Sequence, residues 1–241
     1  MKTINPVYNS RSYYFNNIFI TEHTPTTDIR GLFILLHGFP AWVSKNYDIG
    51  EVLAQQGYKI YIPHHQGLGQ SKGLFKFTEN VNATRELINQ IQNQNPNLGL
   101  SLMGHSWGGY LSLRHLDLIS ERLILLAPLA RFPTDERRKT LVHNLFKNNK
   151  TDLEHYSLEN LESEFELLEK NLNPNKILQD SHICPNTLLI YGTNDDVIPA
   201  DLIKDFSKEV YTKKIDVLAL NDDHRLSKRR PVLNKIAEWI N

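Results

Sequence analysis

The chain contains a single cysteine, Cys184, among its 241 residues. One cysteine cannot form an intramolecular disulfide, and it also excludes a cysteine-rich metal site. No run of about 18 apolar residues occurs, so we expect no membrane span. The segment that follows Met1 lacks the long apolar stretch of a secretory signal. Together these absences predict a cytoplasmic protein.

An excess of either charge is also absent, because Lys+Arg and Asp+Glu each number 27. A net charge of zero supplies no broad positive field of the kind that nucleic-acid binding usually needs, so we expect no nucleic-acid partner. Two short basic runs, Arg137–Lys139 and Lys228–Arg230, are interpreted as solvated helix ends. Neither the G-x-G-x-x-G pattern nor the P-loop pattern occurs, so a nucleotide cofactor is not predicted.

Hydrophobic residues make up 40% of the chain and charged residues 22%, which is ordinary for a globular protein with a large core. Two short strands are predicted at Tyr13–Phe15 and Ile18–Ile20, joined by a turn at Asn16–Asn17. A continuous apolar run at 32–36, typical of a strand buried on both faces, then begins an alternation of predicted strands with helical segments. The further predicted strands are 59–62, 98–103, 123–127, 187–191 and 215–220. The alternation predicts an α/β fold with a mostly parallel central sheet and helices on both faces.

Residues 128–183 interrupt this alternation within what we expect to be one domain, residues 1–241. They are polar, with apolar residues at helical spacing in the segment 158–172. We interpret them as a small helical cap over the mouth of an active site, because they lie between two buried strands. A surface helix packed on the sheet, or a dimer face, would show the same pattern. A monomer and a homodimer are therefore both open.

The strongest chemical signal is the segment Gly104–Gly109, which fits the pattern G-x-S-x-G around Ser106. It follows a predicted strand and opens a predicted helix, which is the context that a nucleophile elbow requires. Small residues on either side permit the sharp turn, and the helix N-terminus favours negative charge that develops beside the hydroxyl. Ser106 is therefore the predicted nucleophile.

A serine hydroxyl is a weak nucleophile, so it needs a base and an acid that orients the base. His224 is the predicted base, because it follows the last predicted strand and is the only histidine after residue 182. The preceding predicted strand is followed by Asp195 and Asp196; Asp195 is the predicted acid and Asp196 the alternative. Asp222 and Asp223 are expected to shape the loop that carries the histidine.

An oxyanion hole needs two backbone N–H groups close to the nucleophile. One is expected from Trp107, the residue after the nucleophile, and the other from Phe39 in the segment His37–Pro40. Pro40 has no N–H to donate, and His37 is expected to brace this segment. Phe39, Trp107 and Tyr110 also suggest an apolar acyl or aryl pocket, in which Tyr110 is the candidate substrate-binding residue.

A pair of histidines, His64 and His65, ends a predicted strand and has the residue type of metal ligands. No third or fourth ligand at a metal-like spacing accompanies them, so we predict no metal site.

With these motifs the chain resembles the α/β-hydrolase superfamily, in particular its small esterases, thioesterases and serine aminopeptidase-like members. In similar proteins the acid is the Asp three residues after the glycine of the loop that begins at Gly192, which selects Asp195. Similar enzymes use no metal or organic cofactor. One departure is that His64 and Gln66 stand where the family often has Asp and Arg. The resemblance rests on the segments 37–40, 67–71, 104–109, 192–199 and 223–226.

The expected function is therefore hydrolysis of a carboxylic ester or thioester of a small molecule, through an acyl-enzyme on Ser106. Amide or peptide hydrolysis on the same triad is the alternative within the class. A catalytically silent small-molecule binding protein, and a lyase or cofactor-free oxygenase, are the alternatives outside it, because a fold does not imply a function.

Overall fold

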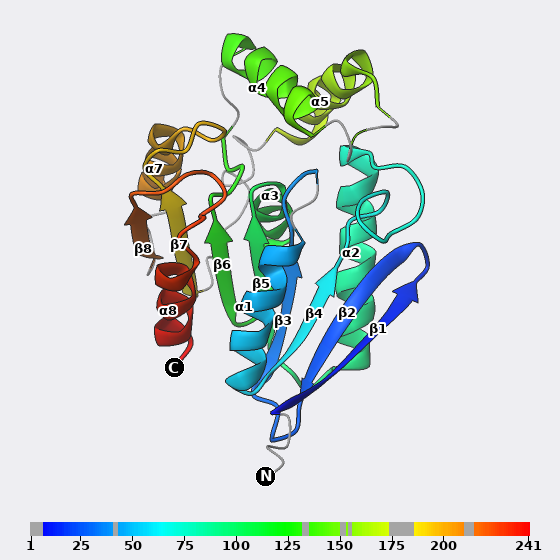
Figure 1. Ribbon diagram of the computed structural model, residues 1–241. Coiled ribbons are helices and arrows are strands. Elements are labelled where there is room, and N and C mark those ends of the chain that lie inside the picture. Colours follow the sequence, from blue (N-terminus) through cyan, green and yellow to red (C-terminus); the bar gives the residue numbers. More distant parts are fainter. Residues whose placement is uncertain are drawn as a thin grey trace, which may run out of the picture.

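The computed structural model describes residues 7–40, 43–131, 135–149, 153, 156–173, 186–209 and 215–241. Its centre is an eight-stranded sheet of order β1-β2-β4-β3-β5-β6-β7-β8 (Figure 1). The hairpin β1–β2 and the pair β2–β4 are antiparallel, and all other neighbours are parallel. The strands are β1 (Tyr8–Phe15), β2 (Ile18–Pro25), β3 (Gly31–Leu36), β4 (Tyr58–Pro63), β5 (Leu100–His105), β6 (Arg122–Leu126), β7 (Asn186–Gly192) and β8 (Ile215–Leu220).

Helices cover both faces of the sheet, and each face has its own apolar core. One core joins α1 and α8 to the sheet, and the other joins α2, α3, α5 and α7 to it. Along β3, Phe33 and Leu35 enter the first core, whereas Leu32, Ile34 and Leu36 enter the second. The helices are α1 (Ser44–Gln55), α2 (Phe77–Gln94), α3 (Trp107–Arg114), the 3-10 turn η1 (Leu116–Leu118), α4 (Asp135–Asn148), α5 (Leu158–Leu172), α7 (Ala200–Glu209) and α8 (Arg229–Ile240). The prediction of a mostly parallel sheet between two helix layers is confirmed.

The first hairpin is longer than its apolar residues predict. Its turn lies at Asn16–Asn17 as expected, with Asn16 in the left-handed region at φ 51°. The strands, however, run from Tyr8 to Phe15 and from Ile18 to Pro25. The outer strand β1 is largely exposed and polar, so backbone pairing with β2 extends it beyond any hydrophobic signal.

The insertion between β6 and β7 contains two helices, α4 and α5, which lie beyond the carboxyl ends of the strands (Figure 1). Leu161, Phe165 and Leu168 of α5 are buried in the second core. These apolar residues of α5 therefore pack within their own chain. Of the interval 128–183, residues 132–134, 150–152, 154–155 and 174–183 lie outside the described residues. Among the helices that are described, none is both long and apolar enough to cross a membrane.

Candidate active site

Ser106 occupies a sharp turn between β5 and α3. Its backbone angles are φ 53° and ψ −112°, a region that costs energy for any residue with a side chain. The turn is held by three backbone hydrogen bonds: Ser106 N–H donates to Leu126 O at 2.9 Å, and Ser106 O accepts from Tyr110 N–H at 3.1 Å and from Leu129 N–H at 3.0 Å. Ser106 is half-buried, whereas its neighbours in sequence are buried. This strained backbone is the geometry of a nucleophile elbow.

Two glycines make the turn possible because the backbone approaches itself closely. A Cβ at Gly104 would lie 2.1 Å from Gly108 O, and a Cβ at Gly108 would lie 2.1 Å from Leu36 O. Both distances are far below any real carbon–oxygen contact. The two outer glycines of G-x-S-x-G are therefore required by space.

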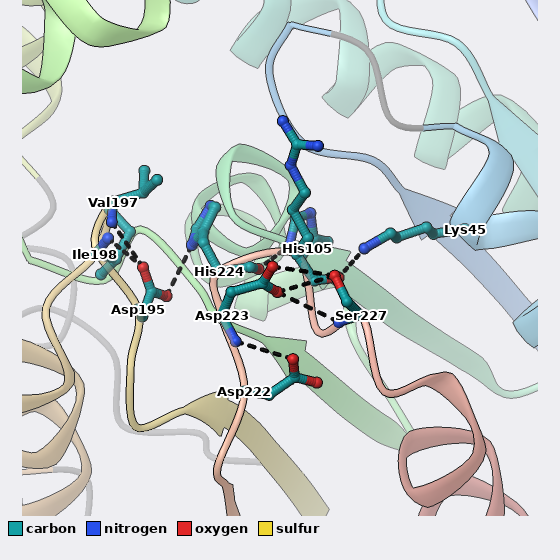
Figure 2. Close-up of polar contacts among 10 residues, drawn as sticks. Lys45, His105, Asp195, Val197, Ile198, Asp222, Asp223, His224 and Ser227 are labelled. Atoms are coloured by element: carbon teal, nitrogen blue, oxygen red, sulfur yellow. Dashed lines mark hydrogen bonds and ion pairs between the residues drawn. The ribbon is translucent and has the colours of Figure 1, made fainter. Parts of the chain in front are cut away.

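Asp195 and His224 form a buried pair at the carboxyl ends of β7 and β8. The carboxylate Oδ2 accepts from His224 Nδ1 at 2.8 Å, and the side chains are 0% and 4% exposed. The other oxygen, Oδ1, accepts from Val197 N–H at 2.9 Å and Ile198 N–H at 2.7 Å, as Figure 2 shows. Asp196 is exposed. The structure thus brings Asp195, the residue predicted from sequence, and not Asp196, to the histidine.

The loop that carries His224 is shaped by its own acidic residues, as predicted. Asp222 accepts from the N–H groups of Asp223 at 2.9 Å and Lys228 at 2.8 Å. Asp223 accepts from the Ser227 hydroxyl at 3.1 Å (Figure 2). These contacts fix the backbone on both sides of the histidine.

Two side chains from other elements also hold this loop. His105 Nε2 donates to His224 O at 3.0 Å, and burial is the main cause that lowers the pKa of His105 to about 3. Lys45 Nζ, from α1, donates to Arg225 O (Figure 2). His105 is therefore a neutral donor that joins the elbow to the His224 loop.

The segment His37–Phe39 lies directly against the elbow, since a Cβ on Gly38 would be 3.3 Å from Ser106 Cβ. His37 Nε2 accepts from His65 N–H at 2.9 Å, so the ring proton is on Nδ1, which donates to Gly38 O at 2.7 Å. Because C=O and N–H of a trans peptide point in opposite directions, this bond turns the Phe39 N–H away from the His37 ring. Among the described residues, no hydrogen bond uses that N–H or the Trp107 N–H.

A second histidine completes this brace. His65 Nε2 donates to His37 O at 2.7 Å, and the two rings lie 4.0 Å apart. Burial holds the pKa of His37 well below its usual range and lowers that of His65 to about 4. His64 Nδ1 accepts from Gln70 N–H at 2.9 Å, so it shapes the loop where the family often has Asp. Both His64 and His65 thus use a ring nitrogen in a hydrogen bond to the backbone. The sequence analysis did not predict this role for His65.

The nucleophile opens into a cavity with two compartments. The inner one has a volume of about 40 Å³, and the outer one about 870 Å³. They share Leu141, Leu145, Val197 and His224, so they adjoin. The inner compartment is lined further by Phe39, Phe77, Ser106, Trp107, Leu129, Phe165 and Ile198. The outer one is lined further by Glu136, Arg137, Thr140, Asn144, Asn149, Asn194, Asp196, Pro199, Asp223, Arg225 and Ser227.

Tyr110 needs a correction, because it is fully buried and is not among the described residues that line either compartment. Its ring stacks on Trp107 with centroids 4.7 Å apart, and its hydroxyl donates to Leu172 O at 2.7 Å. Tyr110 therefore supports the end of α5. Sequence reasoning missed Phe77 and Phe165, which come from α2 and α5, far from the motifs along the chain; the helical spacing around Phe165 was the available signal.

Comparisons with known proteins agree with this geometry. The family model described as serine aminopeptidase, S33, matches residues 27–183. A monoacylglycerol lipase from Mycolicibacterium smegmatis is 32% identical over 90 residues, which covers 36% of this chain and 32% of the lipase. The chain thus matches about a third of that relative's length.

Two solved structures share the fold over almost the whole chain. A monoacylglycerol lipase from Paleococcus ferrophilus has a TM-score of 0.67 and 18% identity, with 92% of this chain and 97% of the lipase covered. An esterase from Pyrococcus furiosus has a TM-score of 0.70 and 14% identity, with 97% and 91% covered. At these identities the likeness concerns the fold alone.

Proposed function

Because the chain belongs to the serine aminopeptidase S33 family of α/β hydrolases, we propose that it is a serine hydrolase that cleaves carboxylic esters or thioesters. The observation that carries the proposal is the buried Asp195–His224 pair, whose histidine lines the same cavity as a serine on a strained elbow. The names of its relatives, a lipase and an esterase, support ester cleavage.

In the proposed reaction, Ser106 Oγ attacks the substrate carbonyl carbon and gives its proton to His224 Nε2. Asp195 holds the imidazole with its proton on Nδ1 and stabilises the imidazolium that forms. The oxyanion accepts from the N–H groups of Phe39 and Trp107; the latter begins α3 and has no acceptor within the helix.

The tetrahedral intermediate then collapses, and the bond to the leaving oxygen or sulfur breaks as His224 Nε2–H protonates that atom. The acyl group stays on Ser106. Water enters, gives a proton to His224 and attacks the acyl carbon. A second collapse returns that proton to Ser106 and releases the acid. No step needs a cofactor.

The interval 128–183 is proposed to act as a cap. Leu141 and Leu145 of α4 and Phe165 of α5 line the compartment that contains Ser106. Water exclusion by such side chains strengthens the electrostatic contacts inside the site.

The test is kinetic. Wild type, Ser106→Ala and the exposed control Ser10→Ala are compared with p-nitrophenyl acetate and with amino-acid p-nitroanilides. We expect Ser106→Ala to lose a factor of about 10⁴ or more in kcat and the control to keep the wild-type rate. An unchanged rate in Ser106→Ala would overturn the proposal. Cleavage of the anilides and not of the ester would instead favour the amide hydrolase.

A further inference from the structure

The two compartments of the cavity differ in both size and chemistry. Their positions relative to the catalytic groups indicate which compartment takes the acyl half of a substrate and which takes the leaving group. The following steps rest on the proposed serine hydrolase function. The nucleophile and both proposed oxyanion donors, Ser106, Phe39 and Trp107, line the inner compartment, whereas His224 lines both. The substrate carbonyl must therefore lie at the mouth of the inner compartment.

The direction of the substrate follows from the proton that His224 delivers. The leaving oxygen must face His224 in order to be protonated, because general acid catalysis needs a donor within hydrogen-bond reach. His224 stands at the boundary, so the leaving group extends into the outer compartment. The acyl chain extends in the remaining direction, into the inner compartment.

The inner compartment is small, and packed rings form one of its walls, here named the end wall. Phe77 lies 4.6 Å from Trp107 and 4.9 Å from Phe165 between ring centroids, and all three are buried. At about 40 Å³ the space holds roughly three water-sized groups, if each needs about 10–15 Å³. This volume matches a short acyl chain, from acetyl to butyryl.

The end wall is also held in place by contacts outside the compartment. The carboxylate of Glu164 on α5 accepts from Phe77 N–H at 3.0 Å, at the start of α2. The Tyr156 hydroxyl, just before α5, donates to Phe75 O. These bonds tie α5 to the rings, so the wall resists the displacement that a longer acyl chain would require.

The outer compartment has the size and chemistry of a site for a large polar group. Its volume of about 870 Å³ lies within the range of roughly 300–1,000 Å³ that is usual for small-molecule sites. Three acidic and two basic side chains line it, which leaves no strong net charge to select an ion. The acidic residues are Glu136, Asp196 and Asp223, and the basic ones are Arg137 and Arg225.

Hydroxyl and amide side chains also line the outer compartment, beside the apolar residues Leu141, Leu145, Val197 and Pro199. Thr140 and Asn144 lie on α4 one helical turn apart, and Asn194 faces the compartment from the loop after β7. Such groups bind hydroxyls, because they can both donate and accept hydrogen bonds. We infer that the preferred substrates are esters of a short acyl group, acetyl to butyryl, with a bulky, uncharged, polyhydroxylated alcohol such as a sugar.

The acyl half is tested with p-nitrophenyl acetate, butyrate and octanoate. We expect kcat/KM to fall about a hundredfold or more from acetate to octanoate, since one surplus methylene alone costs about tenfold. Phe165→Ala opens the end wall and should reduce this ratio at least about tenfold. Leu145→Ala widens the same compartment from α4 and serves if Phe165→Ala does not fold. Leu167→Ala, on the exposed side of α5, is the control and should keep the wild-type ratio.

The alcohol half is tested with acetate held constant. Acetate release from ethyl acetate is compared with release from an acetylated glucoside, with expected kcat/KM values at least about tenfold higher for the sugar ester. Asn144→Leu should lower that advantage.

The outcomes separate this inference from the proposed function. Efficient octanoate cleavage by wild type, or no preference for the sugar ester, would overturn the inference while leaving a serine hydrolase. Failure to cleave any ester, together with failure of a fluorophosphonate to label Ser106, would overturn the proposed function itself.

Discussion

Asp195→Asn is the substitution whose consequence follows most directly from the geometry. Asp195 Oδ1 accepts from two backbone N–H groups, those of Val197 and Ile198, and Oδ2 accepts from His224 Nδ1. An asparagine has one acceptor oxygen and one NH₂ group. If NH₂ faced the two backbone amides, both would lose their acceptor, at about 1–3 kcal/mol each.

The asparagine oxygen therefore stays on the backbone amides, and its NH₂ group must face His224. A donor at that position forces Nδ1 of the imidazole to be the acceptor and moves the ring proton to Nε2. A ring that is already protonated on Nε2 cannot take the proton of Ser106. We expect kcat to fall about ten-thousandfold, or about 5.4 kcal/mol of barrier, with little change in stability.

The assay is p-nitrophenyl acetate hydrolysis together with thermal unfolding, and Asp28→Asn is the control. Asp28 is exposed and is not among the described residues that line either compartment, so its substitution should leave kcat within a factor of about two, because surface changes rarely exceed about 0.5 kcal/mol. The role of Asp195 is refuted if Asp195→Asn keeps kcat within tenfold of wild type, or if Asp196→Asn is the variant that loses activity ten-thousandfold.

Three further outcomes are expected. Gly108→Ala should lower kcat about a hundredfold, since its Cβ would lie 2.1 Å from Leu36 O and must displace the elbow; a wild-type rate would contradict the space argument. His37→Leu should cost kcat about tenfold with little change in KM, and His37→Asn, which keeps a donor to Gly38 O, should recover part of it; equal losses in both variants would refute a positioning role. Acid should destabilise the fold: His37 and His65 are buried neutral, so stability is full above their unfolded pKa of 6.5 and falls as pH drops towards the folded value of about 4 for His65. Unfolding free energies measured between pH 7 and pH 4 test this, and a flat profile would count against it.

The sheet was predictable because its central strands are apolar on both faces. A few consecutive apolar residues are enough to identify such a strand. The elbow was predictable as well, because its glycines are visible in the sequence. The structure gives the reason for them: a Cβ at Gly104 or Gly108 would lie 2.1 Å from a backbone oxygen. Asp195 and His224 were predictable from their places after successive strands, because the carboxyl ends of parallel strands meet at one edge. For these residues, the local sequence and the order of the strands predict the same position in the fold.

The substrate cavity could not be predicted in the same way. Its walls combine residues from α2, α4 and α5, whose packing has no local signature in the chain. Tyr110 was assigned to the substrate because it lies close to Ser106 in sequence, but the helix turns its ring towards Trp107 and α5. Proximity along the chain does not give the direction of a side chain on a helix.

The most direct test of the central proposal is to look for the acyl-enzyme. Wild type is mixed with p-nitrophenyl acetate, quenched in acid during turnover, digested and mapped by mass spectrometry. We predict one acetyl group, on Ser106, and none on that peptide in Ser106→Ala. Continued ester hydrolysis with an unmodified Ser106, or with the acetyl group on another residue, would contradict the account.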